Sequence, residues 1–246
     1  MNFLEILSSE EYNLLNSLTT FREEFNYFKK LDYIYNEYFE IINKTKINPD
    51  NEEPILVSIY FFVHYHYYIT FSCFLRQHLS EAMSSLRKAI DGALTAYYII
   101  EEPKSVYKYL EEDELFKNIK NKIKTIRKSD KSKFNLASDL ILYHEECSKF
   151  GSHADVASFI HRLEVEDAES DKTRKLNFNY FQIFKNENEF KFRYIIFLMG
   201  FLIILKIFKI FFEKKISGIV IPKLEKEFNV LEAVLKSQGK KYKMMI

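Results

Sequence analysis

The sequence predicts an all-α protein, a single helical-bundle domain of roughly eight helices joined by mostly short connections. Only five glycines and four prolines occur among 246 residues, whereas strand-rich domains need these residues for their many tight turns. Hydrophobic residues make up 47% and aromatic residues 17%, enough for a large core and too many for a disordered chain. Long apolar stretches with few breaks between them favour long helices.

The N-terminal part predicts one long amphipathic helix. Thr20 and Glu23 have the spacing of a capping box, and residues 21–42 mix apolar and charged side chains at helical intervals. The segment that follows is rich in Asn, Asp and Glu and breaks this helix. Pro54 suits the first turn of the next helix, where its missing N–H costs nothing.

Residues 55–75 contain no charged side chain and are long enough to span a bilayer. Their tyrosines, histidines, serines and threonine make the stretch too polar for a membrane span, so we expect a central buried helix. His64 and His66 are then hydrogen-bonded polar members of a tyrosine-rich core. Residues 76–103 predict a further helix with one apolar face, formed by Leu86, Ala89, Ile90, Ala93, Ala96, Tyr97 and Ile100.

Residues 117–133 predict a basic amphipathic helix with Ile119, Ile123 and Ile126 along its apolar side. The basic side could be a solvated face balanced by the acidic residues 111–114, or a contact for RNA or another polyanion. The residues that would make this contact are Lys117, Lys120, Lys124, Arg127 and Lys128.

A helix over residues 136–150 is expected to stop at Gly151. Residues 163–175 are polar and predict an exposed loop. Residues 176–192 favour either a small hairpin insertion that turns at 186–188 or the entry to the next helix.

The most apolar window covers residues 194–212, interrupted only by Lys206 and Lys209. It is a candidate membrane span, but both lysines would be costly near a bilayer centre, and a core helix with one wet edge explains them equally well. A last helix over residues 222–236 should end near Gly239 and leave a basic tail. We divide the chain into an N-terminal helical segment 1–53, a helical core 54–217 and a C-terminal part 218–246, in one continuous domain.

Composition and motifs exclude several classes of function. The net charge of +1 gives no global attraction to nucleic acid or membrane. The glycine-rich phosphate loops and the nucleophile elbow of hydrolases are absent from the sequence. The N-terminus has no secretory signal and the two cysteines are far apart, which favours reduced thiols in a cytoplasmic protein.

The segment around Gly151 gathers histidines and a cysteine. His144 and Cys147 are three residues apart and share a helical face, while His153 and His161 follow on separate turns. Zinc sites use paired ligands at short spacings, and this segment has no such pair, so we expect no metal and no cofactor. Cys147 with His144 as nucleophile and base is the weaker alternative, and a helix end packed on its neighbours is the stronger one.

Arg87 and Asp91 interrupt a segment of otherwise apolar and small residues. They lie four residues apart, the spacing at which two charges pair along one helix. We therefore predict a structural ion pair between Arg87 and Asp91.

The order of these segments resembles the HEPN-like helical proteins of bacteria, in particular a branch related to abortive-infection proteins. The resemblance depends on Arg87 with Asp91 four residues later, the small-residue face that follows, and Ser152-His153-Ala154 at the end of a later helix. It covers about residues 55–205. It implies a helical protein that acts within an anti-phage defence or toxin–antitoxin system.

Active members of that family have an arginine followed by four to six residues and a histidine, and they cleave RNA without a metal. None of the six histidines here has an arginine at that spacing, and Lys149 precedes His153 too closely. The sequence therefore favours a non-catalytic helical interaction protein, as a homodimer or larger assembly. A diverged ribonuclease with His153, Arg87 and Lys149 as catalytic residues, and a membrane-attached effector anchored by 194–212, are the alternatives.

Overall fold

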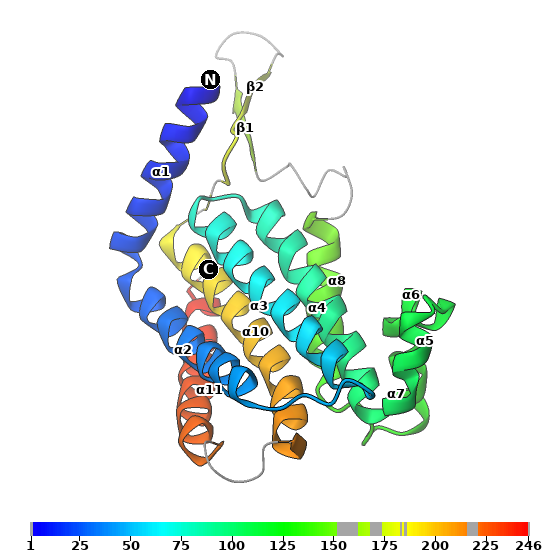
Figure 1. The fold of residues 1–246 in the computed structure, drawn as a ribbon. Helices are drawn as coiled ribbons and strands as arrows, with labels where there is room; N and C mark the ends of the chain where they lie inside the picture. The colour runs from blue at the N-terminus through cyan, green and yellow to red at the C-terminus, as the bar shows by residue number, and fades with distance from the viewer. Residues whose placement is uncertain are drawn as a thin grey trace.

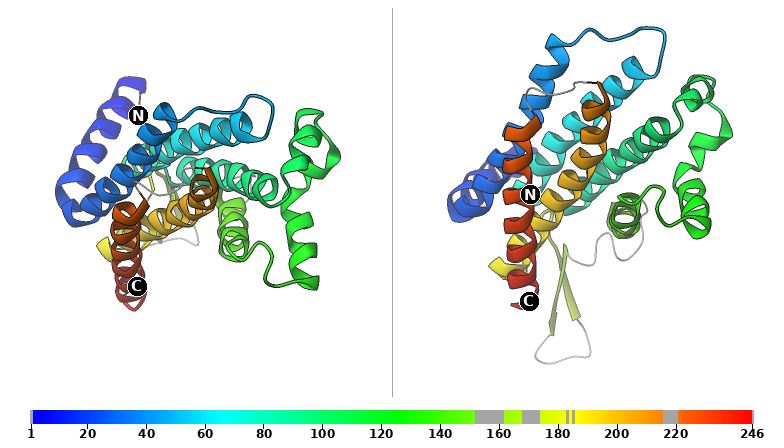
Figure 2. Two further views of the ribbon diagram at one scale, coloured as in Figure 1. Left: turned by 60° about the horizontal axis from the view of Figure 1, so that its bottom comes forward. Right: turned by 90° about the horizontal axis from the view of Figure 1, so that it is seen from below.

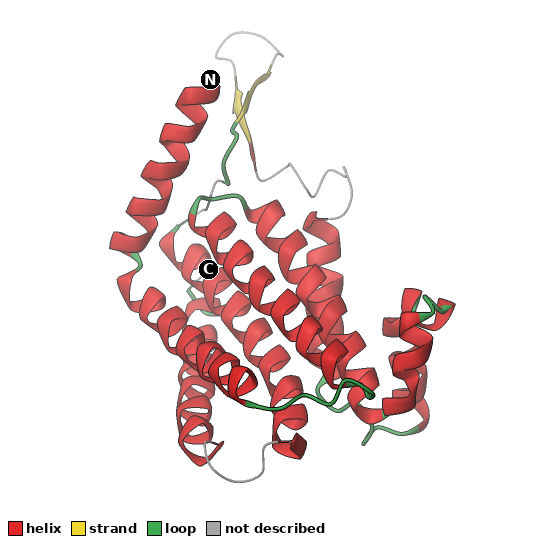
Figure 3. Ribbon diagram, viewed as in Figure 1, coloured by secondary structure: helices red, strands yellow, loops and turns green. Residues whose placement is uncertain are grey.

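Long helices dominate the computed structural model, which describes residues 2–151, 162–167, 174–182, 184, 186–215 and 221–245 (Figures 1 and 3). The predicted all-α class is confirmed, because the strands of the described residues form only one two-stranded hairpin. In chain order the elements are α1 (Phe3–Thr20), α2 (Arg22–Lys44), α3 (Glu53–Leu75), α4 (Leu79–Glu101), the 3-10 helix η1 (Pro103–Ser105), α5 (Val106–Leu110), α6 (Glu114–Lys117), α7 (Ile119–Ser129), α8 (Ala137–Gly151), β1 (Leu163–Asp167), β2 (Arg174–Phe178), α10 (Glu187–Lys215) and α11 (Ile221–Lys243).

Helix α4 lies at the centre of the bundle, with α3, α8 and α10 packed around it (Figure 2). All seven residues of its predicted apolar face are buried. Small side chains allow the close approach: Ala82, Ala89, Ala93 and Ala96 have no exposed surface, and Gly200 of α10 lies against Leu86. Helices α2 and α11 pack on α10, so the three predicted segments share one core.

Helix α3 confirms the predicted helix over residues 55–75, but only one of its sides is buried. The other side exposes large aromatic side chains to solvent. These are Phe61, Phe62, Tyr65 and Tyr68. The predicted buried helix is therefore found, with one buried side and one exposed side.

Buried tyrosine hydroxyls on α2 and α3 are satisfied by backbone carbonyls. Tyr35 donates to the carbonyl of Phe201 at 3.0 Å, and Tyr60 donates to the carbonyl of Tyr35 at 2.6 Å. Burial raises the pKa of both hydroxyls well above the ordinary value, so both remain protonated donors. These bonds join α2 to α10 and α3 to α2.

The two histidines of α3 are both buried and have different partners. His66 Nδ1 and Ser85 Oγ form a hydrogen bond of 2.9 Å, which confirms the predicted hydrogen bond of this histidine. His64 stacks on the ring of Tyr35, and its Nε2 has no hydrogen-bond partner. Burial lowers the pKa of each imidazole, so both are neutral members of the core.

Helix α10 holds the apolar window 194–212 inside the bundle. Among the described residues it is the one helix long and apolar enough to cross a membrane, yet 72% of its most apolar window is buried within the protein. The side of α10 that carries its two lysines contacts α11. Lys206 pairs with Glu232 at 2.7 Å, and Lys209 pairs with Glu225 at 3.0 Å. A core helix accounts for this segment, and membrane attachment stays a prediction.

Two predicted features were wrong. The capping box lies at Asn2 and Glu5, which start α1, and the chain only bends at Phe21 before α2. The hairpin pairs β1 with β2, so it begins within residues 163–175, where a loop was expected, and only the end of β2 falls within the range 176–192.

Of the two alternatives predicted for residues 176–192, the entry to the next helix is the one found at 186–188. Asn186 Oδ1 accepts the amide of Glu189 at the start of α10.

The last helix was also expected to be shorter. It continues through Gly239 to Lys243, because Tyr242 is buried and donates a 2.6 Å hydrogen bond to Glu24 of α2. Burial first, and then this carboxylate, raise the pKa of the Tyr242 hydroxyl, so it stays a donor.

Replacing Glu232 with Gln should destabilise the bundle by about 1–2 kcal/mol, since Lys206 would lose its carboxylate in partly buried surroundings. The matched control is Glu225→Gln, where Lys209 keeps Glu213 and the change should stay within about 0.5 kcal/mol. Urea unfolding measures both variants. Equal losses of stability in the two variants would show that the pair of Lys206 with Glu232 contributes no more than the pair of Lys209 with Glu225.

The same pair predicts a pH dependence. Burial raises the pKa of Glu232, but the hydrogen bonds from Lys206 and Lys236 outweigh it, so the pKa lies below the ordinary 4.5. A depressed folded pKa stabilises the protein above the unfolded pKa, and this contribution is lost as the pH falls through the folded pKa. The stability difference between wild type and Glu232→Gln should therefore shrink below pH 4.5. Urea unfolding at neutral and acidic pH measures it, and a constant difference would contradict the linkage.

Candidate functional site

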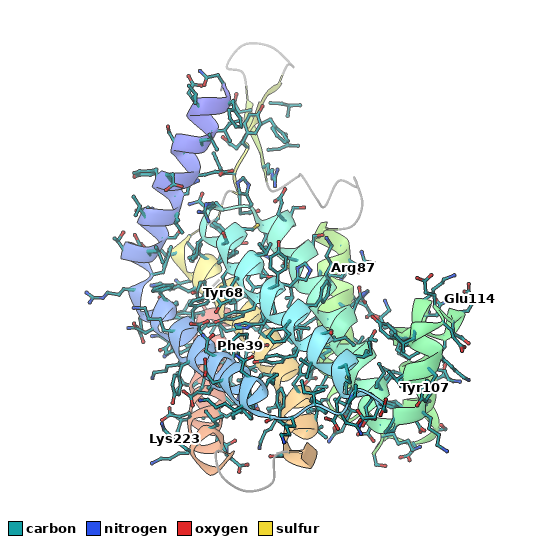
Figure 4. All side chains as sticks on the ribbon, viewed as in Figure 1. Phe39, Tyr68, Arg87, Tyr107, Glu114 and Lys223 are labelled. Atoms are coloured by element: carbon teal, nitrogen blue, oxygen red, sulfur yellow. The ribbon has the colours of Figure 1, made fainter. Side chains whose placement is uncertain are left out.

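A cleft of about 710 Å³ opens between α3 and α4 on one side and α5, α6 and α7 on the other. Helices α5 to α7 form a separate arm beside the bundle, connected to the end of α4 through η1 (Figure 1). Figure 4 labels Arg87 on the α4 side and Tyr107 and Glu114 on the arm, with side chains projecting into the space between. The residues that line the cleft include four basic side chains, Arg87, Lys88, Lys117 and Lys120, and one acidic side chain, Asp91.

His144 of α8 lies at the inner wall of this cleft and is only 5% exposed. Its Nε2 lies 3.0 Å from Asp91 Oδ1, and its Nδ1 lies 3.1 Å from Lys120 Nζ. Arg87 Nε approaches Nε2 at 3.4 Å. One imidazole therefore joins α4, α7 and α8 through charged side chains.

The partners of His144 determine where its proton lies. Asp91 offers only acceptors, so Nε2 carries the hydrogen and donates to it, and Nδ1 accepts from the Lys120 ammonium. Ser148 Oγ is closer to the carbonyl of His144, at 2.7 Å, than to Nδ1, at 3.4 Å, and it donates to the carbonyl. In this tautomer Arg87 Nε cannot donate to Nε2, so the guanidinium donors are available to a molecule in the cleft.

Cys147 lies one turn beyond His144 on the face of α8 that packs against α4. Its Sγ is 3.7 Å from Met83 Sδ, and it is 2% exposed. Burial raises the pKa of the thiol to about 12, so it is protonated at neutral pH. Since both nitrogens of His144 point to other partners, a Cys147–His144 nucleophilic pair is not formed.

The predicted ion pair between Arg87 and Asp91 is corrected by this geometry. The two residues share a stripe of α4 as expected. Among the described residues, however, Arg87 and Asp91 do not form an ion pair with each other, and Asp91 pairs with His144 instead. Both side chains turn to α8 because the buried imidazole lies between them.

The five predicted polyanion-binding residues have different surroundings. Lys117 and Lys120 line the cleft. Lys124 is paired with Glu145, and Arg127 donates to the backbone carbonyls of Lys133 and Phe134, at 2.9 and 2.6 Å. Lys128 is exposed outside the cleft. The basic face of α7 is therefore partly used within the fold, and its first turn faces the cleft.

The predicted catalytic set around residue 153 is not brought together by the described residues. Lys149 is exposed and pairs with Glu146 at 2.7 Å, whereas Arg87 lines the cleft. His153 and His161 lie outside the described residues, so the arrangement predicted around them stays a prediction.

Within the described ranges, no group of three or more His, Cys, Asp and Glu side chains is arranged to hold a metal ion. The residues that line the cleft include basic side chains, side-chain amides and apolar side chains. Comparison of the chain with protein-family models, with curated proteins and with solved structures finds no match in any of the three.

Sequence reasoning missed the pairing of His144 with Asp91 and the contribution of the arm. The i, i+3 spacing of His144 and Cys147 correctly predicted a shared face, and both residues do contact α4. Of the arm, only α7 was predicted, because Tyr109 and Phe116 belong to very short helices, α5 and α6, without a period long enough to detect.

Replacing Cys73 with Ser leaves Cys147 as the one cysteine of the sequence. In this variant we expect Cys147 not to react with a thiol reagent while the protein is folded. Its thiol is buried and its pKa is raised to about 12, so labelling requires unfolding. Labelling should become fast only at denaturant concentrations that unfold the chain. Rapid native-state labelling would instead indicate an open, reactive Cys147.

Proposed function

We propose that this chain is a non-catalytic helical binding protein whose cleft holds a phosphate-bearing ligand. The observation that carries the proposal is the convergence of Arg87 and Lys120, from different helices, on one wall of the cleft beside His144. Arginine and lysine are the side chains that bind phosphate most effectively, the first by its planar fork and the second as a point charge.

The local charge supports an anionic ligand. The chain as a whole has a net charge of only +1, but the cleft is lined by four basic residues and one acidic residue. The carboxylate of Asp91 already accepts a hydrogen bond from His144. An anion entering the cleft would therefore meet an excess of positive charge in partly desolvated surroundings, where charge pairs are stronger than in water.

The protonation state of His144 supports binding without catalysis. A general base needs an exposed lone pair within reach of the proton that it removes. The Nδ1 lone pair of His144 accepts from Lys120, Nε2 donates to Asp91, and the side chain is buried. His144 is thereby suited to hold Lys120 in place beside Arg87.

The resemblance to HEPN-like proteins suggests RNA as the phosphate-bearing ligand and a bacterial defence or toxin–antitoxin system as the setting. We also propose that the protein forms a homodimer or a larger assembly and that it is located in the cytoplasm. The exposed aromatic side of α3 supports association with another protein surface. Diverged ribonuclease activity remains the alternative that the experiment below distinguishes.

Replacing Arg87 or Lys120 with Gln should weaken binding of a fluorescent single-stranded RNA and of pyrophosphate about tenfold each. Lys128→Gln removes the same charge outside the cleft and should change affinity less than about twofold. Fluorescence anisotropy and calorimetry measure the two ligands, and raising the salt concentration should weaken RNA binding.

The RNA should remain intact during these measurements. Cleavage that disappears in His144→Ala or His153→Ala would replace the non-catalytic proposal with a ribonuclease. Failure of wild type to bind either RNA or pyrophosphate would remove the anion-binding proposal.

A further inference from the structure

The lining of the cleft combines two kinds of chemistry. The basic residues Arg87, Lys88 and Lys120 project from α4 and α7. Besides other polar residues, the lining includes apolar and aromatic side chains, from α3 on one side and from the arm on the other. The aromatic residues among them are Phe62, Tyr109 and Phe116. A ligand that uses the whole cleft needs an anionic part and an apolar part.

Phe62 is exposed, yet its ring is held in place. It lies edge to face with His66, with ring centroids 4.5 Å apart, and His66 is itself fixed by Ser85. On the α4 side the ring lies over Gly92, where an added Cβ would come within 3.2 Å of Phe62 Cδ1. The glycine thus provides the space in which the ring lies, and 45% of the side chain remains exposed.

The arm presents a second pair of rings to the same cleft. Tyr109 and Phe116 lie edge to face with centroids 5.1 Å apart, and Phe116 also contacts Tyr98 of α4. Aromatic faces that are exposed but fixed bind planar groups well, because a stacked ring buries a large apolar area at little cost in side-chain entropy.

We propose that the ligand of the cleft carries a planar ring beside its phosphate, as a nucleoside monophosphate unit does, and that Phe62 stacks against this ring. The inference rests on the proposed function, since Arg87 and Lys120 are taken to bind the phosphate. The volume of about 710 Å³ lies within the range of pockets for small organic ligands, about 300–1,000 Å³. Asn118 and Asn121 add amide donors and acceptors for the edge of the ring.

Calorimetry with the full chain tests the ring directly. Uridine and adenosine 5'-monophosphate should each bind about tenfold more tightly than ribose 5-phosphate, which has the phosphate and sugar without the ring. In Phe62→Leu this preference should fall to about twofold or less while ribose 5-phosphate binds as before. Equal binding of all three ligands by wild type would overturn the proposal.

Three further variants test whether the preference depends on the Phe62 ring. Tyr65→Leu removes a neighbouring exposed aromatic residue outside the cleft and should retain the preference. Gly92→Ala should reduce it, because the new methyl group requires the Phe62 ring to shift. Phe62→Ala repeats the test without the leucine side chain, and circular dichroism confirms that each variant is folded. A preference that persists in both Phe62 variants would overturn the proposal.

The outcomes separate this inference from the function on which it rests. If pyrophosphate and ribose 5-phosphate bind through Arg87 but the ring adds nothing, only the inference fails. If none of the probes binds, both fail. Competition by a 5'-phosphorylated RNA hexamer at the affinity of the mononucleotide would identify a strand end as the source of the ring, and much weaker competition would identify a free nucleotide.

Discussion

The burial of α4 on three sides is the constraint on which the rest of the structure depends. Helices α3, α8 and α10 cover it closely because its buried faces carry alanines in place of larger side chains. Only one stripe of α4 is left for polar residues, and it holds Arg87, Lys88, Asp91 and Thr95 at helical spacing. Arg87, Lys88 and Asp91 of this stripe line the cleft, whereas Glu81 of the same helix pairs with Arg162.

Helices α4 and α7 could be predicted from the sequence because each has its own apolar period. The buried face of α4 and the isoleucine side of α7 were both correct for that reason. The hairpin was misplaced because strand pairing depends on a partner elsewhere in the chain: Leu163 and Val165 lie opposite Phe178 and Leu176 across a polar connection. Five-residue strands with mixed charges give too short a pattern to recognise alone.

The candidate site was predictable only in part. Arg87, Asp91, Lys117 and Lys120 were all identified as unusual, and all four line the cleft. Their partners could not be identified, since i, i+4 spacing describes one helix and says nothing about His144, more than fifty residues away. Lys124 and Arg127 show the opposite error, because a basic face on a helix wheel does not reveal which charges the fold itself uses.

His144 explains how two cations can be held side by side in the unliganded protein. Lys120 and Arg87 repel each other, and the negative charge of Asp91, which contacts the same imidazole, lessens this repulsion. The proton on Nε2, fixed by Asp91, leaves Nδ1 to accept from Lys120, and it also prevents Arg87 from donating to Nε2. One cation is thereby anchored and the other left with unused donors, an asymmetry that favours recognition of an external anion over an internal ion pair.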